Sequence, residues 1–368
     1  IKSTGFDYEI QMKGIIRAKN ERAFMNKRWA DLIANDPAYN KHLSLLGNAV
    51  NVECHVLANW DTNFHDRPRI LGLPLTGGSG DYRLILPFHA LRNAALAHAE
   101  YIRIDNGLVR MLTTAELRRL APDSLVMQNV LAYDHINLMK TYREHMPDLL
   151  QVTLLDDLLS GIPEKSSVYK TFKRNFNDCK PRMRQALKYS DRLVVTTQPL
   201  YDFCRDMIED VVVIPNALPR ESWESLTSLK GQGKKPRVGW VGAQQHQGDL
   251  EMIAEVVKAL ADEVEWVFMG MWLPEFEPYI KETHGWVNFA EYPEKLASLN
   301  LDLAIAPLEV NAFNEAKSNL RLLEYGALAL PVVCTDIFPY QTNNAPVKRV
   351  PNTKEAWVAA IRERVHAP

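Results

Sequence analysis

The chain has 368 residues, of which 46% are hydrophobic, and a formal net charge of −2 at pH 7. This length suits two domains of ordinary size, and the nearly neutral charge gives no electrostatic case for binding nucleic acid or a strongly anionic membrane. The four cysteines are scattered without a C-x-x-C pair, which argues against a zinc site and favours a reducing compartment.

No apolar run reaches the roughly 18 residues of a membrane-spanning helix, and no signal peptide is recognisable. We therefore expect a cytoplasmic protein without a transmembrane segment, with peripheral contact at the inner membrane as a second option. Because the sequence begins at Ile1 and not at methionine, we also expect it to be a piece of a longer polypeptide.

Residues 1–66 do not have the pattern of a compact domain, and we expect a helical connector or arm there. Within this segment, 15–36 has apolar positions typical of a helix. That helix should stop at Asp36 and Pro37, because proline does not continue a helix. The arm could pack on the domain that follows it or join it to a separate domain upstream.

Residues 67–218 alternate short apolar runs with helical or polar segments. This alternation predicts a parallel sheet in an α/β domain. The expected strands lie within 67–75, 100–104, 124–130, 149–155, 192–197 and 211–216.

A glycine-rich turn with Gly77, Gly78 and Gly80 follows the first expected strand. Glycine lets a backbone approach an anion closely and offer N–H donors, so Gly78, Gly80 and Asp81 form a candidate phosphate-binding loop. An ordinary tight turn would have the same composition. The pattern is not G-x-G-x-x-G, because Arg83 stands at the third glycine, which argues against a nicotinamide-dependent oxidoreductase.

Two groups of acidic and imidazole side chains in this unit could carry chemistry. Asp156 and Asp157 follow the expected strand 149–155, and paired carboxylates at the end of a strand can supply a general base. The same pair is also common at the start of a helix. His135, next to Asp134, is a second candidate for the base or for an acceptor contact.

Residues 219–235 are polar and contain proline and glycine, which predicts a linker, and a second α/β unit follows in 236–368. Ligands of such sheets bind beyond the carboxyl ends of the strands, so two facing units predict a cleft between the domains. The expected strands lie within 237–242, 264–270, 286–291, 301–308 and 331–334, and a final helix lies within 353–365.

The first turn of the second unit contains Gly242, His246 and Asp249. His246 could donate a hydrogen bond to an anion bound at this turn. We expect Asp249 to cap the helix that follows rather than to take part in chemistry.

The stretch 311–333 combines a polar loop, a helix that should begin at Ser318, and a strand. A helix N-terminus next to Lys317 suits a phosphate. Glu324, on the same face as Arg321 and roughly 9 Å along the axis, can accept from two adjacent hydroxyls such as those of a ribose. An ordinary surface helix would also show this charged face. The apolar positions expected to share its buried stripe are Leu320, Leu323 and Ala327.

The form FN-x-x-KS-x-x-R-x-x-EY-x-A-L-x-x-PVV in this stretch resembles the donor segment of GT-B glycosyltransferases. The similarity is to the family-4-like group that builds bacterial surface polysaccharides such as O-antigen. It implies two facing Rossmann-like domains with an interdomain cleft. It also implies transfer of a sugar from a nucleotide-diphosphate sugar to a glycan or lipid-linked acceptor, without a metal or other cofactor and with retention of configuration in most relatives.

The resemblance assigns the second unit to the donor and the first to the acceptor. In that group the glutamate matching Glu324 binds ribose, whereas the first glutamate of the motif falls here at Ala316. Lys317, Arg321 and His246 would replace the Arg–Lys pair that many relatives place on the diphosphate. The donor contacts implied are Glu324, Lys317, Ser318, Arg321, Asn314, His246, Gly242 and Tyr292, the last near the base.

Three questions stay open. The amides of Asn311 and Asn314 could read sugar hydroxyls or cap the helix. The form DP-x-YN-x-x-LSL at 36–45 resembles the tail of family-2 glycosyltransferase domains, which would place such a domain upstream. Without donor turnover, the same fold would be a non-catalytic module that binds a sugar nucleotide or a glycan.

Overall fold

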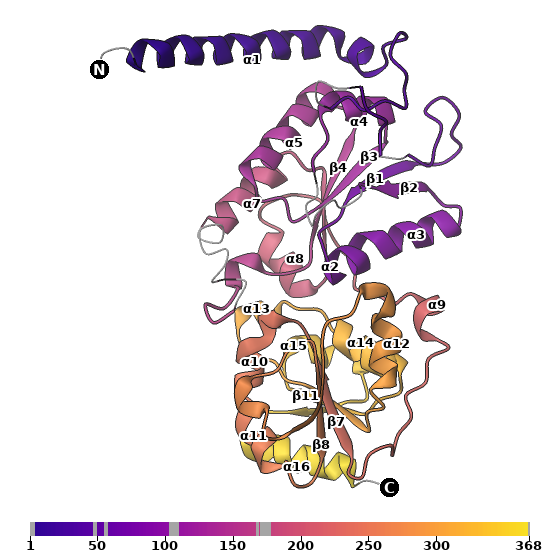
Figure 1. Cartoon of the computed structure of the whole chain (residues 1–368), viewed down its shortest axis with the longest axis vertical. Coiled ribbons are helices and arrows are strands. Elements are labelled where there is room, and N and C mark those ends of the chain that lie inside the picture. The colour runs from indigo at the N-terminus through magenta and orange to yellow at the C-terminus, as the bar shows by residue number, and fades with distance from the viewer. Residues whose placement is uncertain are drawn as a thin grey trace.

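The computed structural model describes residues 4–46, 50–54, 58–102, 110–166, 169 and 178–366. Two α/β domains are stacked end to end, and the long helix α1 lies across the outer end of the first (Figure 1). Each domain is built on a six-stranded sheet whose described strands pair in parallel. The prediction of an α/β protein with two similar parallel sheets is confirmed.

The N-terminal sheet has the strand order β2-β1-β3-β4-β5-β6. Helix α5 packs on one face, where Ile136 and Met139 meet β1 and β3, and α3 packs on the other through Phe88. Because helices cover both faces, the strands are apolar on both sides, as parallel sheets require. The strands are β1 (Arg69–Leu73), β2 (His98–Tyr101), β3 (Ser124–Gln128), β4 (Leu150–Leu155), β5 (Arg192–Val195) and β6 (Val211–Val213). The helices include α3 (Leu86–Asn93), α4 (Thr114–Leu120), α5 (Tyr133–His145), α7 (Cys179–Leu187) and α8 (Gln198–Cys204).

The C-terminal sheet has the order β12-β11-β10-β7-β8-β9. Successive strands are added on one side of β7 up to β9, and then on its other side from β10 onward, so the strand order switches between β7 and β10. Such a switch point is where open α/β sheets bind ligands. One face is covered by α12 and α14, the other by α10, α11 and α16. The strands are β7 (Arg237–Val241), β8 (Glu265–Met269), β9 (Ile280–His284), β10 (Leu303–Ala306), β11 (Val332–Thr335) and β12 (Lys348–Val350). The helices include α9 (Arg220–Trp223), α10 (Gln247–Glu251), α11 (Ala254–Ala259), α12 (Tyr292–Ser298), α13 (Ala312–Glu315), α14 (Leu320–Ala327), α15 (Phe338–Gln341) and α16 (Lys354–Val365).

Two strands of this sheet differ from the prediction, and one of them is β12, which lies in none of the expected runs. The expected strand at 286–291 is not present, and the chain forms β9 at Ile280–His284 instead, followed by a short 3₁₀ turn at Phe289–Glu291. β9 is an edge strand, and its side chains alternate between half-buried and exposed positions. An edge strand can be largely polar because one side faces solvent, so a search for apolar runs misses it.

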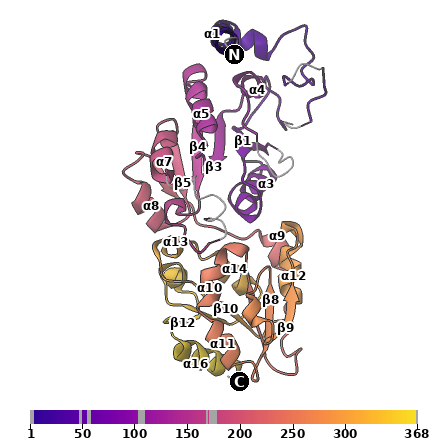
Figure 2. The same ribbon diagram turned by 60° about the vertical axis from the view of Figure 1, so that its left-hand side comes forward.

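The arm is held on the N-terminal domain by α4. Helix α1 (Thr4–Ala34) is followed by an irregular segment, and the side chain of Arg119 on α4 donates to the carbonyl oxygens of Ala34 and Leu43 at 2.8 and 2.7 Å. Arg118, also on α4, forms an ion pair with Asp31. The arm therefore packs beside α4 (Figure 2). Among the described residues, no helix is both long and apolar enough to cross a membrane.

The two domains contact each other through apolar packing and hydrogen bonds. Ala316, 2% exposed, packs with Leu155 and Leu200 of the N-terminal domain. The hydroxyl of Thr197, at the start of α8, donates to the carbonyl oxygen of Ala316 at 2.8 Å. The position where the resembling group has its first glutamate is thus part of the domain contact.

Candidate active site

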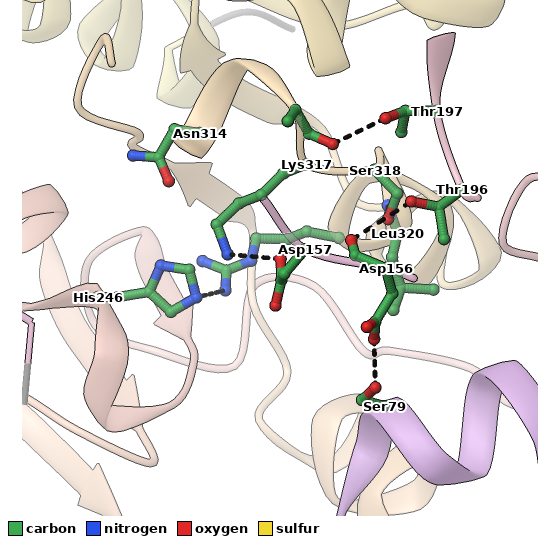
Figure 3. Close-up of polar contacts among 12 residues, drawn as sticks. Ser79, Asp156, Asp157, Thr196, Thr197, His246, Asn314, Lys317, Ser318 and Leu320 are labelled. Atoms are coloured by element: carbon green, nitrogen blue, oxygen red, sulfur yellow. Dashed lines mark hydrogen bonds and ion pairs between the residues drawn. The ribbon is translucent and has the colours of Figure 1, made fainter. Parts of the chain in front are cut away.

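A cavity of about 260 Å³ lies between the domains, where the loops after β1 and β4 face those after β7 and β10. Figure 3 shows its polar side chains, with Lys317 reaching toward Asp157 and Ser79 pairing with Asp156. The predicted site residues that line this cavity are Gly78, Asp156, Asp157, His246, Lys317, Ser318, Arg321 and Glu324.

A second, smaller cavity of about 160 Å³ adjoins the first and shares Gly78, Arg321 and Glu324 with it. Its other lining residues include two of the predicted donor contacts, Gly242 and Tyr292. The two cavities therefore form one polar and one mostly apolar compartment on either side of Arg321.

Arg321, in the first turn of α14, is the cation at the junction of the two cavities. Its guanidinium carbon lies 5.3 Å from the ring centre of Trp240, over the face of the ring. Among the described residues no carboxylate lies within ion-pair distance of it, and its buried Nη1 has no hydrogen-bond partner. Arg321 is half-buried, and a partly buried cation that has no carboxylate within ion-pair distance is suited to an anionic ligand.

His246, in the turn after β7, is buried and lies between the carboxylate of Asp249 and the guanidinium of Arg321. Its Nδ1 is 2.6 Å from Asp249 Oδ2, and its Nε2 is 3.3 Å from Arg321 Nη2. Burial and the nearby Arg321 guanidinium lower the pKa of His246 to about 4, so the ring is neutral at pH 7. A direct N–H bond from His246 to a phosphate would require this arrangement to change.

Asp249 does not cap a helix, contrary to the prediction. It lies within α10, where its Oδ1 accepts from the backbone N–H of Glu309 at 2.6 Å and from the Asn314 amide at 2.9 Å. Asn311 caps α13 by accepting from the Asn314 N–H at 2.9 Å. Asn314 is thus buried on α13, and its contact with a sugar donor stays a prediction.

Helix α14 begins at Leu320, two residues after the predicted cap. The Ser318 hydroxyl still accepts weakly from the Leu320 N–H, at 3.4 Å, and accepts from the Asn216 amide at 2.7 Å. The predicted buried stripe is wrong: Leu320 and Leu323 are half-buried and Ala327 is exposed. The sheet instead receives the adjacent face of the helix, formed by Leu322, Tyr325 and Leu328.

Glu324 is 7% exposed and holds a hydroxyl on each carboxylate oxygen. Tyr82 of the N-terminal domain donates to Oε1 at 2.8 Å, and Tyr292 donates to Oε2 at 3.0 Å. Burial raises the pKa of Glu324, against the opposing effect of these hydrogen bonds and of Arg321. The carboxylate is therefore bound to two hydroxyls, the same chemistry as a vicinal diol.

The two aspartates after β4 differ in their contacts. Both oxygens of Asp156 are bound, one by the Ser79 hydroxyl and the other by the Asn129 amide at 3.2 Å. Asp157 has a looser contact, 3.9 Å from Lys317 Nζ. Burial raises the pKa of Asp157, which suits this carboxyl to exchange a proton.

The other predicted residues of the N-terminal domain lie outside the described lining of both cavities. Gly80 and Asp81 follow Gly78 in the turn into α3, and burial raises the pKa of Asp81. His135 is half-buried on α5, and burial lowers its pKa. Their roles in binding or catalysis stay predictions.

We expect Gly80→Ala to destabilise the protein by about 2 kcal/mol, the usual cost of overpacking. A Cβ at this position would come 1.9 Å from the carbonyl oxygen of Leu75, which is backbone and cannot turn away. Gly78→Ala is the matched control, because its Cβ would meet nothing closer than Phe289 at 4.0 Å. Thermal unfolding measures both, and equal midpoints for the two variants would contradict the prediction.

Sequence patterns missed several residues of the cavity, among them Tyr82 and Arg83. Tyr82 contacts Glu324 across the domain boundary, and Arg83 lines the cavity while its Nη1 donates to Asn216 at 2.9 Å. Burial lowers the pKa of Arg83, whose buried Nε has no hydrogen-bond partner. The sequence offered one signal for Arg83: it stands where the third glycine of a G-x-G-x-x-G loop would be.

Among the residues that the structure describes, no cluster of three or more histidine, cysteine, aspartate or glutamate side chains could hold a metal ion. No protein-family model and no curated protein sequence matches the chain.

Solved structures do match. Anabaena HepE in complex with UDP and glucose is 12% identical, with a TM-score of 0.53, over 82% of this chain and 90% of HepE. HepE in complex with UDP is 13% identical, with a TM-score of 0.50, over 81% and 91%. The lipopolysaccharide outer core galactosyltransferase WaaB is 13% identical, with a TM-score of 0.49, over 82% and 90%. With its two facing parallel sheets and the cavity between them, the chain has the GT-B fold.

Proposed function

We propose that this protein is a glycosyltransferase that moves a sugar from a nucleotide-diphosphate sugar to an acceptor. The observation that carries the proposal is the Arg321 guanidinium, which lines both cavities without a carboxylate partner among the described residues and has a buried Nη1 without a hydrogen-bond partner. Lys317 lines the same cavity. A diphosphate would supply the missing negative charge, and these cations would stabilise the charge that develops on it as it leaves.

The remaining parts of the donor fit the neighbouring groups. Glu324, which now accepts from two tyrosine hydroxyls, would accept from the ribose diol. The smaller cavity is bordered by Trp286, 66% exposed, and by Tyr292, and it offers an aromatic surface for the base. HepE, which shares the fold, was solved in complex with UDP and glucose, and this supports a nucleotide and a sugar as ligands.

We assign the acceptor to the N-terminal side of the cavity, where Ser79, Asp156 and Asp157 lie. The acceptor would be a growing glycan or a lipid-linked sugar in bacterial surface polysaccharide synthesis. This assignment is supported by the resemblance of the 311–333 stretch to the family-4-like group. We further propose retention of configuration without a metal, which the anomeric proton coupling of the product tests directly.

A direct test measures nucleotide release from UDP-, GDP- and dTDP-sugars, with and without glycan acceptors, for the wild type and Glu324→Ala. Release from one donor that the variant loses is the expected result. Binding of a nucleotide without release from any donor would move the assignment to a binding module. Absence of binding to every donor would overturn the proposed donor site.

One observation favours the binding module as the second candidate. Ala316 takes the position of the glutamate that precedes the ribose-binding one in the resembling group, and its side chain is packed between the domains. The neighbouring Glu315 accepts from the backbone N–H of Phe338 at 3.2 Å and does not line either cavity. A carboxylate for the donor sugar is therefore missing from this segment.

Asp157→Asn is expected to lower kcat/KM for the acceptor on the order of 10²-fold, as when a general base is lost. The wild-type rate should rise with pH as Asp157 deprotonates, at a pH above the ordinary aspartate range, since burial raises its pKa against the pull of Lys317. In the Asp157→Asn variant, this rise of the rate with pH should be absent. Steady-state rates across pH measure both effects. Asp156→Asn, whose oxygens are already bound, is the control, and a larger loss there would contradict the assignment.

Tyr82→Phe is expected to bind the free nucleotide about 10-fold more tightly, because a bond to a charged group is worth about 1.5–3 kcal/mol. The Tyr82 hydroxyl occupies an oxygen of Glu324 that the ribose would use, so the donor must displace it. Isothermal titration with UDP or GDP measures the change. Tyr292→Phe removes the equivalent bond within one domain and serves as the comparison. Weaker binding by Tyr82→Phe would show that Tyr82 helps to hold the nucleotide.

A further inference from the structure

We propose that Asp249 is a positioning residue that sets the tautomer of His246, and that His246 in turn holds the Arg321 guanidinium in place for the donor diphosphate, a role that rests on the proposed function. Asp249 is 5% exposed and lies behind His246, as seen from the cavity lined by His246 and Arg321. Asp249 lines neither of the two cavities of the candidate site, and it borders only a very small cavity beside Glu309.

The hydrogen bonds determine which nitrogen of His246 carries the proton. An arginine guanidinium has only donor groups, so Nε2, at 3.3 Å from Arg321 Nη2, must present its lone pair. The proton is then on Nδ1, which donates to Asp249 Oδ2 at 2.6 Å. Figure 3 marks the contact between the His246 ring and the guanidinium with a dashed line. Asp249 thus acts on Arg321 through the imidazole.

Asp249 is itself fixed as an anion. Its second oxygen accepts from the Glu309 N–H at 2.6 Å and from the Asn314 amide at 2.9 Å. Burial alone would raise its pKa, but the hydrogen bonds from His246 and Glu309 hold the pKa below the ordinary range. A permanent acceptor therefore faces Nδ1.

The guanidinium of Arg321 has little room to rearrange. It lies over the ring of Trp240, and a Cβ on Gly242 would come 2.9 Å from its Nη2. With Nη2 held by His246, the Nη1 group stays without a partner among the described residues. If Nε2 of His246 carried a proton, it would be a hydrogen-bond donor and no longer an acceptor. The N–H would repel Nη2 of Arg321 and turn Nη1 away from its present position.

Asp249→Asn tests this arrangement without changing the shape of the side chain. The asparagine oxygen can keep the bonds from Glu309 and Asn314, while its amide N–H faces His246 Nδ1. The imidazole then carries its proton on Nε2, opposite Arg321. We expect kcat/KM for the donor to fall roughly 10- to 100-fold, the range seen when a residue that orients a ligand-binding histidine is changed.

The same substitution in a His246→Gln background separates positioning from a merely structural role. The glutamine oxygen can accept from Arg321 and has no tautomer to change, so Asp249→Asn should then cost less than about 2-fold, a non-additive result. If Asp249 only holds the Glu309 loop, the loss will be equal in both backgrounds, and the proposal fails.

A spectroscopic measurement decides the proposal independently of turnover. ¹⁵N NMR of the histidine ring should show Nδ1-protonated His246 in the wild type and Nε2-protonated His246 in Asp249→Asn. An unchanged tautomer overturns the proposal even if activity falls. If the wild type binds no UDP, GDP or dTDP, the proposed function fails. The NMR measurement of the His246 tautomer still tests separately whether Asp249 positions His246 and Arg321.

Discussion

Replacing Arg321 by alanine is expected to lower donor turnover on the order of 10³-fold, the cost of removing one group that stabilises charge in a transition state. Arg321 is the guanidinium at the junction of the two cavities, and its Nη1 has no partner among the described residues. Arg321→Lys keeps the charge but loses the guanidinium that lies over the Trp240 ring, so we expect an intermediate loss. Steady-state nucleotide release with the best donor measures both variants.

The matched control is Arg362→Ala, because Arg362 forms an exposed ion pair with Glu263 on the far side of the C-terminal domain. Exposed pairs contribute at most about 1 kcal/mol to stability, so this variant should keep wild-type turnover. If Arg321→Ala also kept it, the diphosphate would have to lie elsewhere, and the observation that carries the proposed function would lose its meaning.

Replacing Glu324 by alanine should also lower kcat/KM for the donor on the order of 10³-fold. Two hydrogen bonds to a charged acceptor, at about 2 kcal/mol each, amount to about 4 kcal/mol, or nearly three powers of ten. Glu324→Gln retains one acceptor oxygen and should lose less. Titration of each variant with nucleotide, alongside donor turnover, distinguishes lost binding from lost chemistry.

Glu315→Ala is the control for Glu324, since Glu315 belongs to the same segment but bonds to the Phe338 N–H outside both cavities. It should change nucleotide affinity little. Equal affinities for wild type and Glu324→Ala would mean that the carboxylate only joins Tyr82 to Tyr292, and that the ribose does not contact it.

Several features of the fold follow from local pattern alone. Alternating apolar runs and helices predicted the two parallel sheets, because each buried strand must be apolar on both faces. Lys317, Arg321 and Glu324 do line the cavity; Arg321 and Glu324 share one side of α14, whereas Lys317 lies before the helix begins.

Tertiary packing settled what local pattern leaves open. The buried stripe of α14 passes through Leu322 and Tyr325 rather than Leu320 and Leu323, because both faces are apolar and only contact with the sheet chooses between them. The edge strand β9 is largely polar, so its composition does not identify it as a strand. It forms a strand because it pairs with β8.

Long-range partners have no local signature at all. Asp249 meets Asn314, 65 residues away, and Glu324 meets Tyr82 across 242 residues. A sequence pattern reports periodicity over a few turns, whereas the bond between Asp249 and Asn314 depends on how distant segments pack within the C-terminal domain, and the bond between Tyr82 and Glu324 on how the two domains dock. The sequence alone therefore indicates the fold and part of the charged face of the site, and tertiary packing within and between the domains determines which groups that face meets.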